Sequence, residues 1–277
     1  MIEYLYLGRV DYGEGLRLQT EVADLVAEGR TQNVLLLLEH PPVLTMGRNA
    51  NRANILASGE LLARRGVTIH EINRGGDVTY HGPGQLVGYP IFDLRSLRGP
   101  AGGRMGPVDF VRLMEEALIR LCGVYGVRAG RVAGLTGVWC AARGGPLEES
   151  SGKERKIGAI GIHVARGITS HGFAFNVTTN LDDFGLIVPC GIPDHAVTSL
   201  ASEVDRPADL PTLETIAQQA ARLFGQVFGE QVLAVESLAT LCAQDAASPK
   251  FLAEDTPLQV PAEVERLLHT PDRPTRA

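Results

Sequence analysis

The chain has 277 residues, of which 44% are hydrophobic and 21% charged, a composition typical of globular proteins and unlike collagen-like or disordered chains. Its 26 basic and 32 acidic residues give a formal net charge of −6, which argues against a nucleic-acid partner because phosphate-backbone binding needs a basic surface. The longest aliphatic run, Val34 to Leu38, is far shorter than the ~20 apolar residues that span a bilayer, and no secretory signal pattern is present. We therefore expect a cytoplasmic globular protein with neither a membrane segment nor a nucleic-acid partner.

Cysteine and lysine are both sparse in this chain. The four cysteines show no C-x-x-C pair and no spacing typical of zinc ligands, so free thiols are expected and neither a metal site nor a cofactor is indicated. Lysine occurs only three times, at positions 153, 156 and 250, against 23 arginines. Chemistry that needs a lysine must therefore use one of very few residues.

The N-terminal part of the chain is expected to alternate strands with helices. Alternation and short apolar runs predict strands over residues 2–7, 34–38, 67–73 and 86–94. Apolar residues at helical spacing predict helices over residues 12–29 and 60–65. The segment 43–48 follows two prolines and is predicted to be a turn region.

The C-terminal part adds two clear helices and a hairpin. Helices are predicted over 107–125, which begins with a proline, and over 213–228; strands are predicted over 137–142, 156–164 and 168–177. The first two of these strands are expected to form a hairpin around the polar loop 143–155. We predict an α/β (α+β) fold with a mixed β-sheet flanked by helices, as one domain over residues 1–255 followed by a flexible tail over 256–277.

The segment from Arg74 to Gln85, RGGDVTYHGPGQ, is the most unusual stretch of the sequence. Five of its twelve residues are Gly or Pro, which permit tight turns and a close approach of the backbone to a ligand. A tight hairpin with a buried histidine explains the same pattern without a ligand. Because neither G-x-x-x-x-G-K-[ST] nor a strand-anchored G-x-G-x-x-G occurs, the segment does not indicate a nucleotide loop.

A second candidate segment, KIGAIGIH, runs from Lys156 to His163. Gly158 and Gly161 remove side-chain bulk from the predicted strand and are expected to leave room beside it for an apolar ligand. An exposed, solvated lysine is the ordinary alternative. In a chain that uses arginine almost everywhere else, however, Lys156 indicates a need for a compact ammonium that can also act as a base.

The third candidate is Cys190, which lies between Pro189 and Gly191. This setting favours a sharp turn that presents the thiol, as a nucleophile requires. The other three cysteines, Cys122, Cys140 and Cys242, lie in predicted helices or strands and are expected to be small buried hydrophobic residues. A structural role for Cys190 remains the alternative.

Together with SHGFAFNV (Ser170 to Val177) and PCGI (Pro189 to Ile192), these segments resemble the octanoyltransferases of lipoate biosynthesis, also called lipoyl(octanoyl) transferases or the lipoate-protein ligase B family. The resemblance covers about residues 1–230 and implies the α/β catalytic domain shared with biotin and lipoate protein ligases. It implies transfer of an octanoyl group from octanoyl-acyl carrier protein to a lysine through a cysteine thioester, without a cofactor. The implied acceptors are the lipoyl domains of 2-oxo-acid dehydrogenases and the glycine cleavage H protein.

The resemblance also implies roles for individual residues. Cys190 would carry the acyl group, and Lys156 would favour its thiolate form and later take a proton from the acceptor lysine. The substrate-binding residues that it implies are Arg74, Gly75, Gly76, Asp77, Val78, Thr79, Tyr80, His81, Ala159, Ile160, Gly161, Gly172, Phe173 and Ala174. Phe173 and Phe175 stand where relatives commonly have aliphatic residues, which leaves the acyl-chain length open.

Two other enzyme classes fit part of the pattern. An ATP-dependent lipoate or biotin protein ligase would share the fold, but the thiol in P-C-G and the shortage of lysines for phosphate contacts argue against it. A cysteine hydrolase could use His81, His171 or His195 as its base. A binding module without catalysis is a third alternative, and the motifs give it the least support.

Overall fold

The computed structural model describes residues 1–100, 102–141, 154–189 and 195–243. Cys190, the tail over 256–277 and nearly all of the 143–155 loop lie outside these described residues. The contacts group Met1–Gln244 into one compact unit. The predicted domain end at residue 255 and the flexible tail therefore stay predictions.

A mixed β-sheet forms the centre of the described chain. Its strand order is β12 (Val232–Ala234), β1 (Ile2–Arg9), β2 (Asn33–Glu39), β6 (Gln85–Ile91), β10 (Ile168–Asn176), β9 (Arg155–Ala165), β8 (Leu135–Cys140) and β7 (Ala129–Val132). The pairs β12–β1 and β1–β2 are parallel, and the remaining pairs along this order are antiparallel. The short β11 (Ala196–Val197) pairs in parallel with β9. The sheet confirms the predicted mixed α/β architecture, including the β8–β9 hairpin.

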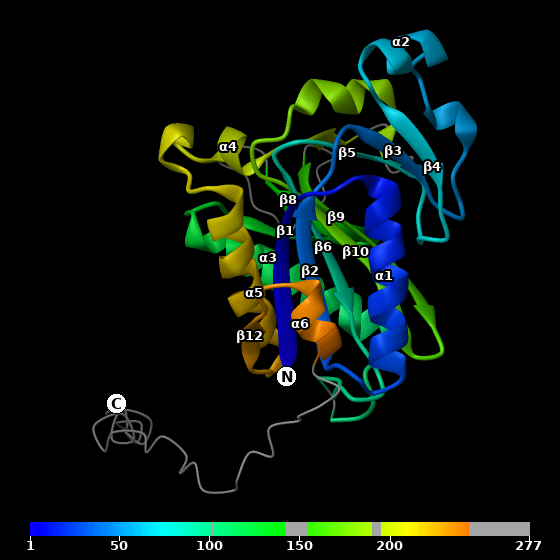
Figure 1. Ribbon diagram of the computed structural model, residues 1–277. Coiled ribbons are helices and arrows are strands. Elements are labelled where there is room, and N and C mark those ends of the chain that lie inside the picture. Colours follow the sequence, from blue (N-terminus) through cyan, green and yellow to red (C-terminus); the bar gives the residue numbers. More distant parts are fainter. Residues whose placement is uncertain (101, 142–153, 190–194, 244–277) are drawn as a thin grey trace, which may run out of the picture. The chain divides into compact units, whose positions relative to one another are not determined.

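Helices cover both faces of the sheet (Figure 1). On one face, α1 (Tyr12–Ala27) packs Leu18 and Val22 against alternate residues of β2 and β6. On the other, α3 (Pro107–Val124) and α5 (Leu213–Phe228) pack against the opposite side of the same strands. Burial on both faces explains why β2 is apolar along nearly its whole length.

Local sequence signals set where these helices begin and end. Asp11 caps α1 by accepting a hydrogen bond from the backbone N–H of Gly13 at 2.8 Å. Thr212 caps α5 through the N–H of Thr215, and Gly229, with φ +68°, ends that helix. Shorter helices are α2 (Gly59–Arg64), α4 (Leu200–Glu203), α6 (Leu238–Ala243) and the 3₁₀ segments Arg52–Asn54, Leu181–Leu186 and Pro207–Asp209.

A second, small sheet has the order β4 (Thr68–Glu71), β3 (Val43–Met46) and β5 (Val78–His81). It corrects one prediction, because residues 43–46 form the central strand of this sheet rather than a turn. Leu44 is fully buried and pairs with Ile69 on one side and Tyr80 on the other. Pro41 and Pro42 precede the strand, so they remove no donor from its hydrogen-bond ladder.

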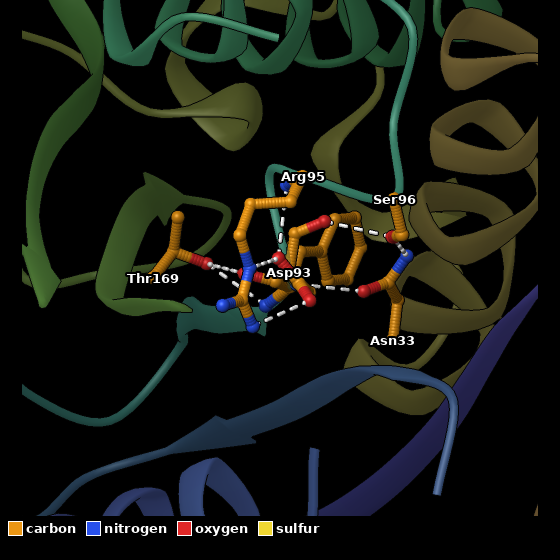
Figure 2. A network of polar contacts seen from close by, with 6 residues as sticks. Asn33, Asp93, Arg95, Ser96 and Thr169 are labelled. Carbon is orange, nitrogen blue, oxygen red and sulfur yellow. Dashed lines mark hydrogen bonds and ion pairs between the residues drawn. The ribbon is translucent and has the colours of Figure 1, made fainter. Parts of the chain in front are cut away.

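A polar network ties β2, β6 and β10 together at one end (Figure 2). Thr169, fully buried, accepts a hydrogen bond from the Phe92 N–H at 2.9 Å and donates to the Pro90 carbonyl at 2.6 Å. Asp93 accepts from the Arg95 side chain at 2.8 Å, and its own N–H donates to Asn33 Oδ1 at 2.8 Å. The Arg95 guanidinium lowers the pKa of the Asp93 carboxyl below its usual value. This end of the sheet is therefore held by hydrogen bonds with matched partners.

The helices of the described residues are too short or too polar to cross a membrane.

Candidate active site

A cavity of about 230 Å³ lies beside the middle of β6 and β10. It is bounded by the start of α1, the segment leading into β5, the β7–β8 turn and the middle of β9 and β10. Its lining residues are Tyr12, Arg74, Gly76, Asp77, Thr79, His81, Val87, Tyr89, Gly134, Leu135, Thr136, Lys156, Ala159, Ile160, Gly161, His171, Gly172, Phe173 and Ala174. The fold thus brings three motifs that are far apart in sequence to one cavity.

Most of the residues expected to bind substrate line this cavity. Exceptions are Gly75, Val78 and Tyr80, which do not. Val78 and Tyr80 alternate with Thr79 and His81 along β5, so they point to the opposite face, where Tyr80 packs on Phe184 at 5.5 Å. A role of Val78 or Tyr80 in binding would have to act through the strand that carries them.

Gly161 and Gly172 line the cavity and also let neighbouring backbone approach their strands closely. A Cβ on Gly161 would lie 2.7 Å from the Gly75 carbonyl oxygen, and a Cβ on Gly172 would lie 2.1 Å from that of Gly88. The sequence had suggested that such bare positions leave open space beside the strand. The space at Gly161 is instead filled by the Arg74–Gly75 turn, whose Gly75 N–H donates to the Ile162 carbonyl at 3.2 Å.

Charged side chains shape the turn from Arg74 to Asp77. The Arg74 guanidinium donates to the carbonyls of Gly75 at 2.7 Å and Asp77 at 2.8 Å. The Asp77 carboxylate accepts from the backbone N–H of Asn51 at 3.0 Å and of Val78 at 2.7 Å. These contacts hold the turn against the cavity, which explains why a Gly-rich segment also needs two charged residues.

His81 lies at the cavity wall as a neutral ring. Its Nδ1 is 2.8 Å from Gln85 Oε1, and burial lowers its pKa to about 3. Gln85 Nε2 donates to Asn176 Oδ1 at 2.9 Å, and Asn176 Nδ2 donates to the Thr198 carbonyl at 2.9 Å. Because the Thr198 N–H donates to the Lys156 carbonyl at 2.9 Å, this chain of bonds joins His81 to the backbone of Lys156.

Lys156 is only 9% exposed and lies beside Trp139. Its Nζ is 4.5 Å from the centroid of the Trp139 ring, a cation–π contact between paired residues of β8 and β9. Lys156 lines the main cavity and also two small adjoining cavities, which are both lined by Pro189. His195, the first described residue after 190–194, lines one of them and lies edge-on to Trp139 at 5.0 Å. Both described neighbours of the 190–194 segment therefore lie near Lys156.

The described thiols lie in the core. Cys122 and Cys140 are free and buried. Burial raises the pKa of Cys140 to about 12 and that of Cys122 well above its usual value. Both are therefore poor nucleophiles, as the sequence indicated.

Sequence reasoning missed several lining residues, chiefly Tyr12, Tyr89 and the 134–136 turn. Tyr12 and His81 stack with their ring centroids 5.9 Å apart, although 69 positions separate them in sequence. Tyr89 binds His40 Nε2 through its hydroxyl at 2.6 Å. No local pattern marks these residues, since the aromatic spacing along α1 and β6 is that of ordinary core positions.

His171 adds an unusual conformation to the cavity wall. Its φ is +57°, a left-handed value that is rare for residues other than glycine, and its Nε2 is 2.7 Å from Asn73 Oδ1. Burial, followed by the charge of Arg74, lowers its pKa to about 4. His171, like His81, is therefore uncharged near neutral pH. Within the described ranges, no cluster of His, Cys, Asp or Glu could hold a metal ion.

Comparison with known proteins agrees with this geometry. The family described as the lipoyl protein ligase A/B catalytic domain matches residues 11–222. The octanoyltransferase of Acidobacterium capsulatum is 60% identical over 239 residues, covering 86% of this chain and 94% of that protein. The octanoyltransferase of Koribacter versatilis is 51% identical over 267 residues, covering 96% of this chain and 97% of that protein.

Solved structures support the fold. A bipartite lipoate protein ligase from Thermoplasma acidophilum aligns with a TM-score of 0.63 at 16% identity, covering 88% of this chain and 91% of the other. A lipoate-protein ligase A bound with ATP aligns with a TM-score of 0.61 at 14% identity, covering 88% of this chain and 93% of the other. The match to the family over residues 11–222 and the identity to full-length relatives show that the chain belongs to the lipoyl protein ligase A/B catalytic domain family, as one of its octanoyltransferases.

Proposed function

We propose that this chain is a cytoplasmic octanoyltransferase that takes octanoyl from octanoyl-acyl carrier protein and passes it to a lysine of a lipoyl domain. The acceptors would be the lipoyl domains of 2-oxo-acid dehydrogenases and the glycine cleavage H protein. Cys190 carries the acyl group as a thioester between the two steps, and Lys156 assists both. No cofactor is needed, because the acyl group arrives activated.

One observation supports this proposal above the others. Lys156 is buried at the wall of the main cavity, and Pro189 lines the two small cavities that adjoin it. A peptide bond joins Pro189 to Cys190, so the thiol is covalently tied to a residue beside the ammonium. A nearby ammonium favours a thiolate, which is the nucleophilic form.

The two steps balance without an external energy source. In the first, the Cys190 thiolate attacks the carbonyl carbon of the donor, the bond to the carrier sulfur breaks, and the carrier leaves as a thiol with a proton taken from the Lys156 ammonium, which leaves Lys156 as a neutral amine. In the second, the amine of the acceptor lysine attacks the enzyme thioester, the bond to the Cys190 sulfur breaks, and Lys156 receives the proton lost by the amine. A thioester is exchanged for a thioester and then for a more stable amide.

The cavity suits an unbranched acyl chain. Val87, Ile160, Phe173 and Ala174 contribute apolar side chains to its wall. Each methylene that leaves water for such a wall contributes about 0.8 kcal/mol, so an eight-carbon chain gains several kcal/mol on entry. We assign Arg74, Gly76 and Asp77, with Thr79, His81, Ala159, Gly161 and Gly172, to the rest of the substrate site.

Intact-mass spectrometry after incubation with octanoyl-acyl carrier protein tests the first step. We expect the mass of one octanoyl group on the enzyme, removed by hydroxylamine and absent from Cys190→Ala. Cys140→Ala is the matched control, and its adduct should equal that of the unmodified enzyme. An adduct that persists in Cys190→Ala would show that another group carries the chain, and a strict requirement for ATP would favour a ligase.

A further inference from the structure

Trp139 is the only tryptophan of the chain, and it is fully buried on β8. Its partner in the β8–β9 register is Lys156, whose Nζ lies 4.5 Å from the ring centroid. The negative face of an indole attracts a cation, and the attraction grows when water is excluded. The ammonium of Lys156 is therefore held over an aromatic face.

No carboxylate of the described residues forms an ion pair with Lys156. Three acids on neighbouring elements have other partners: Glu115 pairs with Arg131 at 3.0 Å, Glu203 with Arg155 at 3.0 Å, and Glu154 lies 3.8 Å from His195 Nδ1. A carboxylate in contact with the ammonium would compete for its charge with any anion formed in the site. An indole face holds the ammonium without neutralising it.

The surroundings of Trp139 fix the indole and the lysine stem together. His195 contacts the indole with its ring plane at 65° to it, and the His195 Nδ1 is 3.3 Å from the Glu154 carbonyl oxygen. On the other side, Gly137 has φ +120°, and a Cβ there would lie 3.5 Å from Lys156 Cε. The Gly137 N–H donates to Glu115 Oε1 at 3.0 Å, which ties this part of β8 to α3.

We propose that Trp139 is a positioning residue of the octanoyl transfer, whose indole face holds the Lys156 ammonium in place to act on Cys190. This inference rests on the proposed function, in which Lys156 and Cys190 work together. It adds to that function the group that orients the lysine, and it explains why a buried lysine can stay beside the cavity without an ion pair to a described carboxylate.

Fluorinated tryptophans test the inference without removing the ring. Because Trp139 is the only tryptophan, biosynthetic incorporation of tryptophan with one to four fluorines on the ring changes this residue alone. Each fluorine weakens the negative face of the indole and changes its shape little. The measurements are octanoyl transfer to a lipoyl domain and the rate of Cys190 alkylation by iodoacetamide against pH, followed by peptide mass spectrometry.

We expect a graded response. The alkylation profile should move to higher pH with each fluorine, and transfer should slow by roughly 2- to 30-fold over the series. The same substitutions in Lys156→Ala are the control, and there they should have no effect. Suppose that Lys156→Ala shifts the alkylation profile but fluorination changes neither the profile nor the transfer rate. That result would overturn the role of Trp139 and leave the Cys190–Lys156 pair standing. If Lys156→Ala itself leaves the profile unchanged, the proposed Cys190–Lys156 pair fails and the inference fails with it.

Two variants give an independent measurement. Trp139→Phe keeps an aromatic face, whereas Trp139→Leu removes it. We expect kcat to fall more in Trp139→Leu than in Trp139→Phe, with KM for the carrier protein unchanged in both. Equal losses in the two variants, or losses confined to KM, would contradict a positioning role.

Discussion

At the end of β6 and the start of β10, buried polar groups have matched partners, whereas at the cavity beside the middle of these strands Lys156 is buried without an ion pair to any described carboxylate. Thr169 and Asp93 belong to the first end, where each bonds to neighbouring backbone or to an opposite charge (Figure 2). Lys156 and His81 line the cavity, where Lys156 lies against the face of Trp139 and burial lowers the pKa of His81. The first region is arranged for stability and the second for chemistry, because a base that already forms an ion pair with an acid is less able to accept a proton from a substrate.

The largest effect should come from Lys156 itself. Lys156→Ala removes both the charge and the proton acceptor, so octanoyl transfer should fall by about 10²- to 10⁴-fold. Lys156→Arg keeps the charge but cannot give up its proton near neutral pH, so it should form the acyl-enzyme yet discharge it poorly. Single-turnover measurements of loading and discharge separate the two steps, and an Arg variant that discharges like the unmodified enzyme would rule out Lys156 as the base.

The packing of β10 against β6 gives the next largest effect. A Cβ on Gly172 would lie 2.1 Å from the Gly88 carbonyl oxygen and 2.5 Å from Pro90 Cδ, so Gly172→Ala should lower the free energy of unfolding by about 3 kcal/mol or abolish folding. Gly185→Ala is the matched control, because nothing lies within 4 Å of a Cβ there. Urea unfolding of both variants measures the difference, and equal stability would mean that the two strands can separate at no cost.

The buried histidines near the cavity should make the stability of the fold sensitive to acid. Burial lowers the pKa of His40 to about 4 and that of His81 to about 3, whereas an unfolded histidine titrates near 6.5. Below pH 6.5 the unfolded chain therefore binds more protons than the folded chain. The free energy of unfolding should be highest above that pH and should fall as the pH is lowered toward 4. The decline should be on the order of 2–3 kcal/mol for each histidine.

Urea unfolding at pH 7.5 and pH 4.5 measures this decline. His81→Asn keeps a donor near Gln85 Oε1 but has no proton to gain, so its dependence on pH should be shallower. In the network of Thr169, Arg95 lowers the pKa of Asp93, so that pair should lose its contribution only at pH values below the ordinary range of an aspartate. Stability that does not change between pH 7.5 and 4.5 would contradict the neutral, buried state of these histidines.

A smaller change is expected from the Thr169 end. Thr169→Val keeps the shape of the side chain but leaves the Phe92 N–H without its acceptor, which should cost about 1–3 kcal/mol. Octanoyl transfer by the folded variant should equal that of the unmodified enzyme, because none of the residues in this network lines the cavity. A loss of transfer in folded Thr169→Val would show that this network and the cavity are coupled.

Phe173 should give the smallest effect, on acyl-chain length. It lines the cavity and stacks on Phe224 at 5.4 Å, so Phe173→Leu should lengthen the apolar slot. We expect the ratio of kcat/KM for decanoyl to octanoyl donors to rise by roughly tenfold, as two accommodated methylenes allow. Phe175→Leu, fully buried outside the cavity lining, is the control and should leave the ratio unchanged.

Local pattern was enough to predict most of the elements. The apolar run of β2, the helical spacing in α1 and α3 and the glycine after α5 are signals that neighbouring residues carry by themselves. The strand β3 was missed, because its burial depends on pairing with β4 and β5 rather than on its own sequence. The close contact of Gly161 with the Arg74–Gly75 turn was also missed, since only the folded chain brings the two together.

The residues of the candidate site also divide into those that local sequence predicts and those that it does not. The motifs containing Arg74, Lys156 and Phe173 could be read from the sequence, and the fold brings them to one cavity. Trp139 and Tyr12 could not be predicted, because a tryptophan in a strand and a tyrosine at a helix start are ordinary core residues in sequence. Their places beside Lys156 and His81 arise from the register of β8 with β9 and from the packing of α1, which no local pattern encodes.

The most direct test of the central claim is the fate of isolated octanoyl-enzyme. The enzyme is loaded from octanoyl-acyl carrier protein, separated from the donor, and mixed with a lipoyl domain in buffer free of ATP and magnesium. We predict that one octanoyl-lysine appears on the lipoyl domain for each thioester lost from Cys190, within a single turnover. Release of the chain as free octanoate, or a thioester that persists until ATP is added, would contradict direct transfer from cysteine to lysine.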